Sequence, residues 1–134
     1  MTIIPDNILK LISPADRKAL GKAGLTAEEA MARCQVRQER DLQNLLKNLL
    51  SHRGIWYAWT RMDKKNTSKL GTPDFLFAVN GKACAWECKI GNERMSEEQQ
   101  DTSLKMIGNG WHFAVIRSYD EGRAFLGMVE EAGG

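Results

Sequence analysis

The chain has 134 residues, of which 43% are hydrophobic, and a formal net charge of +2. This length predicts one globular domain, with a core large enough to need neither disulfides nor a structural metal. The near-neutral charge excludes a global basic field, so any binding of nucleic acid must come from local clusters of cations.

The cysteines and the hydropathy pattern bear on the compartment. Cys34, Cys84 and Cys88 lack the paired spacing of a zinc site, and we interpret them as reduced thiols. No apolar run approaches the roughly 18 residues of a membrane span, and the N-terminus lacks the order of a signal peptide. We therefore expect a soluble cytoplasmic protein without a membrane partner.

Helix signals dominate the first third of the chain. Ser13 followed by Pro14 is typical of an N-cap and a first helical residue, and we expect a short helix from there to about Leu20. Thr26 then opens a capping box, which predicts a second helix that we expect to continue to His52.

The second half of this long helix carries a leucine stripe that must pack on a sheet. Its members are Leu42, Leu45, Leu46, Leu49 and Leu50. Glu39 lies three residues before the stripe, beside the buried face, where a lone carboxylate is costly unless a positive charge meets it. Alternatively, Glu39 belongs to a charged, solvated surface run.

An aromatic-rich run, 55–62, predicts the first strand, which we expect to pair with the strand after Asp74. Lys64, Lys65 and Lys69 lie in the loop between these two strands. A cationic loop at this place can follow a phosphate backbone, although lysine-rich loops are also common as plain solvated connections.

Two neighbouring strands follow. Pro73 precedes Asp74 at the mouth of the apolar run 75–79, and Asn80-Gly81 is a strong signal for a tight hairpin. The run 82–89 should therefore fold back antiparallel beside the first strand.

Alternation along the returning strand places Glu87 and Lys89 on one face and Cys88 on the other. Oxygen ligands such as Asp74 and Glu87 suit Mg²⁺ or Mn²⁺, which can activate water and hold a phosphate, while Lys89 can assist the attack. Taken singly, an Asp after Pro is also a common turn residue, and Glu-x-Lys is also a common solvated pair.

The remaining elements are a helix and a strand. Ser96 and Gln99 form a capping box that starts a helix to about Ile107, and the run 111–116 predicts a fourth strand, parallel to the third. Residues 120–130 fit neither a helix nor a strand well.

Together, Pro73-Asp74, the hairpin and Glu87-Cys88-Lys89 resemble the motif of the PD-(D/E)XK nucleases. Gly71-Thr72 ahead of Pro73 is similar to the VRR-NUC branch of that superfamily. The resemblance covers about residues 36–118, with one departure, since Ile90 intervenes before Gly91 where the family often has glycine directly after the lysine. It implies an α/β restriction-endonuclease-like core, with a mixed four-stranded sheet in the order α-β-β-β-α-β.

The resemblance also implies roles for single residues. Asp74, Glu87 and, as the best match to a helix glutamate of the family, Glu39 would hold Mg²⁺ or Mn²⁺, with the Cys88 carbonyl as a further ligand. Gln99 would face the site, a role that we expect to compete with its cap because one amide cannot point both ways. Lys89 would assist the attack of water on a DNA phosphodiester.

Small members of that family look like phage or bacterial enzymes that act as dimers on branched DNA, including Holliday junctions. We therefore expect a homodimeric endonuclease in the cytoplasm of a bacterial or phage-infected cell, with residues 1–35 as a helical extension for dimerisation and 36–134 as the nuclease core. The alternative for the extension is that it folds onto its own domain. The rival function is a non-catalytic module that binds nucleic acid or a protein.

Overall fold

The structure, a computed structural model, describes residues 4–20, 25–60 and 71–131. In chain order its elements are α1 (Asp6–Leu9), α2 (Pro14–Ala19), α3 (Ala27–Ala32), α4 (Glu39–His52), β1 (Tyr57–Trp59), β2 (Phe75–Val79), β3 (Lys82–Cys88), α5 (Glu97–Gly108), β4 (His112–Ile116) and α6 (Tyr119–Glu131). The protein is therefore a mixed α/β fold. Among the described residues, no helix has the length and hydropathy needed to cross a membrane.

The four strands form one mixed sheet in the order β1-β2-β3-β4. The pairs β1–β2 and β2–β3 are antiparallel, whereas β3 and β4 are parallel, with α5 as the crossover between them. This topology confirms the predicted order of strands and the parallel fourth strand. The hairpin is also confirmed, because Asn80 and Gly81 both have positive φ, as the tight turn requires.

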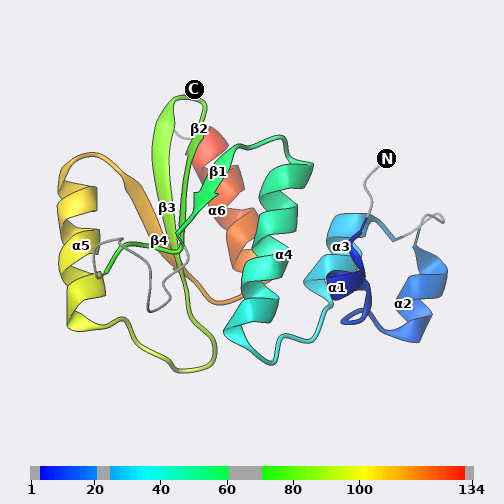
Figure 1. Ribbon diagram of the computed structural model, residues 1–134. Helices are drawn as coiled ribbons and strands as arrows, with labels where there is room; N and C mark the ends of the chain where they lie inside the picture. The colour runs from blue at the N-terminus through cyan, green and yellow to red at the C-terminus, as the bar shows by residue number, and fades with distance from the viewer. Residues whose placement is uncertain (1–3, 21–24, 61–70, 132–134) are drawn as a thin grey trace.

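Helices flank the sheet on both sides (Figure 1), with α5 on one side and α4 and α6 on the other. Trp86 of β3 is fully buried at the centre of the core beneath α4 and α6. Its ring meets Phe77 and Phe125 edge-on, at centroid separations of 4.8 and 5.6 Å. Such contacts fix ring orientation as well as burying area.

The predicted leucine stripe of α4 is confirmed, since all five leucines are fully buried. Each contributes about 2 kcal/mol through burial, so the helix is held firmly in position and angle. This rigidity matters because the first residue of α4 is Glu39.

The expected continuous helix from Thr26 to His52 is wrong, because the structure divides it into α3 and α4. The Asp41 carboxylate accepts hydrogen bonds from the backbone N–H groups of Arg37 and Gln38, at 3.1 and 3.0 Å. These bonds satisfy donors that a new helix N-terminus exposes, so α4 begins there without a proline or glycine to mark the break.

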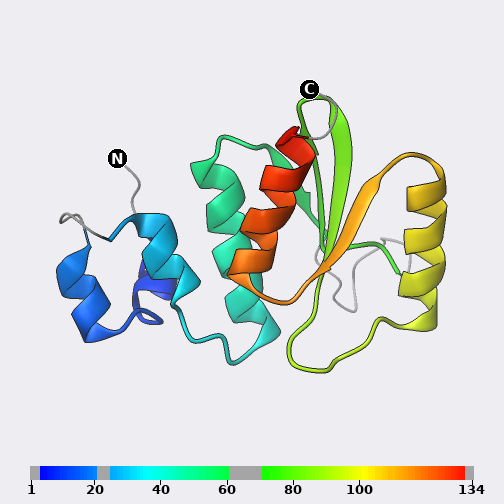
Figure 2. The same cartoon turned by 180° about the vertical axis from the view of Figure 1, so that it is seen from behind.

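Residues 119–131 form the helix α6, although the sequence pattern favoured neither a helix nor a strand there. Its buried face includes Tyr119, Gly122, Phe125 and Val129, which are spaced as one helical stripe once the glycine is counted. A side chain at Gly122 would place its Cβ 2.7 Å from a Leu46 methyl carbon, so glycine allows α6 to pack closely on α4. Figure 2 shows the two helices side by side over the sheet.

On the side away from the sheet, α1 packs on α4 and α3 contacts α6 (Figure 1). Ile8, Ile12 and Leu25 are buried within the chain's own core. Glu28 of α3 also forms ion pairs with Arg53 at 3.0 Å and with Arg123 at 3.3 Å. This packing agrees with the alternative that the extension folds onto its own domain, while homodimerisation stays a prediction.

Candidate metal centre

Asp74 stands immediately before β2 and is 9% exposed. The backbone N–H of Thr60 donates to the Asp74 carbonyl at 2.8 Å, and the Thr60 hydroxyl donates to the Pro73 carbonyl. The Asp74 carboxylate itself accepts the backbone N–H of Cys88 at 2.8 Å. Both the backbone and the carboxylate of Asp74 are therefore held by neighbouring strands.

Glu87 and Lys89 project from the same face of the sheet, as alternation along the strand predicts. Both residues are buried: Glu87 is 2% exposed and Lys89 is 7% exposed. Lys89 Nζ lies 3.9 Å from Glu87 Oε2. A solvated surface pair is excluded by this burial. The Lys89 backbone N–H donates to the carbonyl of Ile116 at 3.2 Å, which extends the β3–β4 pairing past Cys88.

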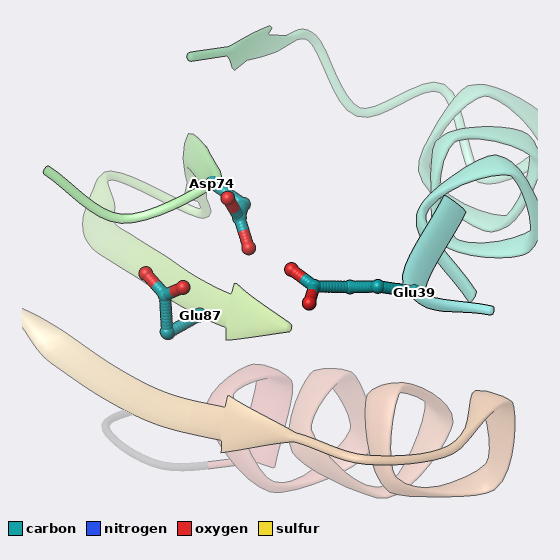
Figure 3. Close-up of side chains that lie close together, drawn as sticks. All are labelled: Glu39, Asp74 and Glu87. Carbon is teal, nitrogen blue, oxygen red and sulfur yellow. The ribbon is translucent and has the colours of Figure 1, made fainter. Parts of the chain in front are cut away.

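Glu39 reaches the same place from the N-terminus of α4. The carboxylates of Glu39, Asp74 and Glu87 offer one oxygen each within 4.8 Å of one another. Figure 3 shows the three side chains converging from α4, the start of β2 and β3. The surface alternative for Glu39 is thereby disfavoured, because its carboxylate points into the cluster.

Burial raises the pKa values of all three acids, and repulsion between carboxylates adds to the shifts of Glu39 and Glu87. Burial, followed by repulsion from Asp74, raises the pKa of Glu87 to about 9, although Lys89 opposes the shift. Burial and repulsion from Asp74 likewise raise the pKa of Glu39 to about 7. Burial raises the pKa of Asp74 too, and the Cys88 N–H partly offsets this effect. At neutral pH, Glu87 and in part Glu39 therefore hold protons in the metal-free protein, and a bound cation would displace them.

One atom of the cluster stands out. Glu87 Oε1 is buried and has no hydrogen-bond partner among the described residues. A buried carboxylate oxygen without a partner is costly, and proteins compensate such groups by pairing or by metal coordination. The three carboxylates fit a hard divalent cation such as Mg²⁺ or Mn²⁺, because these ions prefer oxygen ligands.

Gln99 caps α5 and contacts the cluster at once, so the expected competition between its two roles is wrong. Its Oε1 accepts the backbone N–H of Ser96 at 2.8 Å, while its Nε2 donates to Glu87 Oε2 at 3.1 Å. The amide has an acceptor at one end and a donor at the other, and each end serves one of the two partners.

A cleft of about 630 Å³ opens over the cluster between α4 and α5. Some residues that line the cleft are not part of the sequence motif. Gln43, one helical turn after Glu39, places its Nε2 3.5 Å from the Glu39 carboxylate, and Arg40 lines the cleft beside it. Spacing of one turn from Glu39 is the signal that could have revealed Gln43.

Gly71 lies where the chain passes close to α5. Its φ is +88°, and a Cβ there would stand 2.4 Å from the carbonyl oxygen of Glu98. Only glycine permits this approach, which brings the segment before Asp74 against the helix that carries Gln99.

Cys88 and the lysine loop complete the predicted set. The Cys88 thiol is buried in the core, and its backbone N–H supports Asp74; the ligand role of its carbonyl stays a prediction. Lys64, Lys65 and Lys69 lie outside the described residues.

Comparison with known proteins found no matching family model, no matching curated protein and no matching solved structure. Any functional assignment therefore depends on the chemistry of the cluster itself.

Proposed function

We propose that the protein is a Mg²⁺- or Mn²⁺-dependent nuclease of the PD-(D/E)XK type that hydrolyses DNA phosphodiester bonds. The observation that carries the proposal is the meeting of three carboxylates and one lysine, nearly all buried, at the floor of a cleft. A structural ion-pair network does not need an excess of acids with an unpartnered oxygen, whereas a metal centre does.

Different side chains of the protein would have different roles in the reaction. Glu39, Asp74 and Glu87 would hold the cation, which supplies Lewis-acid activation of water and of the phosphate. The Cys88 N–H and Gln99 orient two of these carboxylates, so that their oxygens keep their places when charge changes nearby.

Lys89 lies beside the cluster with its ammonium group 3.9 Å from Glu87. From this position it can donate a hydrogen bond to the attacking water or to a phosphate oxygen as negative charge develops there. The water oxygen forms the new bond to phosphorus and gives up a proton to solvent, the bond between phosphorus and the leaving sugar oxygen breaks, and that oxygen takes up a proton.

Branched DNA, including four-way junctions, is the substrate class that we propose to test first, with two copies of the chain making the paired cuts.

The lysine loop with Lys64, Lys65 and Lys69 is proposed as a contact to the DNA backbone. Simultaneous neutralisation of these lysines should lower the slope of log affinity against log salt by roughly one for each phosphate that the variant no longer neutralises.

A cleavage assay tests the proposal directly. Linear, flapped and four-way DNA are incubated with Mg²⁺, with Mn²⁺ or with EDTA, using the wild type and Glu87→Gln. Glu130→Gln makes the same chemical change at an exposed carboxylate of α6 and serves as the control. We expect metal-dependent cleavage that Glu87→Gln abolishes and Glu130→Gln preserves.

Calorimetric titration of Mg²⁺ and Mn²⁺ into the same proteins separates binding from chemistry. DNA binding without cleavage under every metal condition would instead favour the non-catalytic module. Cleavage in EDTA, or undiminished metal affinity in Glu87→Gln, would contradict the assignment of the metal centre.

A further inference from the structure

A second hollow, of about 390 Å³, lies on the sheet at the end remote from the metal centre. The described residues that line it are all apolar, and among them are Trp56, Ala78, Ala83 and Trp111. Trp56 is 80% exposed, which is unusual for the largest apolar side chain, and Trp111 is half-buried.

The strand register explains how the hollow forms. Ala78 of β2 pairs with Ala83 of β3. Trp56 and Trp111 stand one residue before the outer strands β1 and β4, so continuing the register of these strands by one residue puts them level with the two alanines. A row across the sheet therefore reads tryptophan, alanine, alanine, tryptophan. The two alanines and the two tryptophans together line the hollow.

This row lies on the same face as the metal centre. Asp74 and Ala78 are separated by an even number of residues along β2 and its entrance, as are Glu87 and Ala83 along β3, so all four side chains project to one side. Four residues of extended chain span about 13 Å. A strand of nucleic acid with a phosphate at the metal centre reaches the tryptophans within a few nucleotides.

We propose that this hollow binds unpaired nucleobases by stacking on Trp56 and Trp111, and the proposal rests on the nuclease function given above. An aromatic wall offers a stacking surface to any base, and the described lining holds no charged group that could attract a phosphate. Bases inside a continuous duplex have their faces covered, so only unpaired bases fit. The substrate would therefore carry single-stranded character near the cut.

The size of the hollow argues against a protein occupant. A stable interface between two copies takes about 20–30 residues a side, and this apolar surface is far smaller.

Binding measurements in EDTA test the proposal without cleavage. Fluorescence anisotropy compares a labelled oligothymidylate with a fully paired hairpin, for the wild type, Trp56→Ala, Trp56→Phe and Met128→Ala. Met128 is another exposed apolar residue, 61% exposed on α6, and serves as the matched control. We expect Trp56→Ala to weaken single-strand binding about tenfold, Trp56→Phe to restore part of the affinity and Met128→Ala to change nothing.

The outcomes separate this proposal from the nuclease assignment. Metal-dependent cleavage by the wild type, with single-strand affinity unchanged in Trp56→Ala, overturns the stacking site and leaves the nuclease standing. Single-strand binding through Trp56 without cleavage in Mg²⁺ or Mn²⁺ overturns the nuclease assignment and leaves the stacking site standing. Equal losses for hairpin and single strand, or a dimer in light scattering that Trp56→Ala dissociates, would also overturn base stacking.

Discussion

Replacing Glu87 by glutamine should affect the metal-free and the metal-loaded protein in opposite directions. In the metal-free protein Glu87 is 2% exposed, one of its oxygens lacks a partner among the described residues, and two further carboxylates lie close by. Glutamine keeps the shape, cannot ionise and supplies an N–H group that can donate to Asp74. The variant should therefore gain stability when no metal is present.

The gain can be estimated from the cost of a buried polar group without a partner, on the order of 2 kcal/mol. For 134 residues, an unfolding entropy of about 2.1 cal/mol/K per residue converts this gain into a rise in Tm of about 7 °C. A metal ion at 100 times its Kd stabilises the wild type by about 2.7 kcal/mol, or about 10 °C, and should stabilise Glu87→Gln far less.

Thermal unfolding by circular dichroism, with EDTA and with a titration of Mg²⁺ or Mn²⁺, measures both effects in one experiment. Glu130→Gln, the exposed control, should follow the wild type in both conditions. A lower Tm in EDTA together with an undiminished metal response would refute the reasoning, because Glu87 would then be a structural group and not a ligand.

Three further predictions concern other parts of the site. Lys89→Ala should lower the cleavage rate at least about hundredfold while calorimetry and anisotropy show metal and DNA binding retained; unchanged turnover would remove its catalytic role. Gly71→Ala should lower stability by at least about 2 kcal/mol through its φ of +88° and its clash with α5, whereas Gly54→Ala, with φ +70° but open space around it, should cost about 1 kcal/mol in the same denaturant titration. The folded-state pKa values of Glu39 and Glu87 are raised to about 7 and about 9, so the metal-free Tm should fall as pH rises from about 5 to 9. The rise in Tm that the metal causes should grow over the same pH range, because the metal displaces protons from these carboxyl groups. A Tm that does not change with pH would contradict the raised pKa values.

Much of the fold follows from local patterns. The hairpin was predictable because Asn80 and Gly81 adopt positive φ at low cost, and the helix starts at Ser13, Thr26 and Ser96 were predictable because their side chains accept nearby N–H groups. Each of these signals involves residues within a few positions of one another.

The errors arose where packing over longer distances decides. The α6 stripe depends on Gly122, which carries no hydrophobic side chain of its own and is buried because Leu46, Leu49 and Trp86 lie against it. The break before α4 depends on the Asp41 carboxylate turning back to two backbone donors, an alternative that helix periodicity does not register.

The sequence by itself determined the strand pairing, the faces of the two central strands and the residue types of the site, because alternation and turn chemistry are local properties of the chain. Only the tertiary structure decided that Glu39 meets Asp74 and Glu87, since this depends on the angle at which the buried leucines set α4 against the sheet. It likewise decided that Gln99 serves the cap and the cluster together, and that Trp56 and Trp111 line one hollow with two alanines. Such meetings depend on the register and packing of elements far apart in the chain, and no short stretch of sequence contains that information.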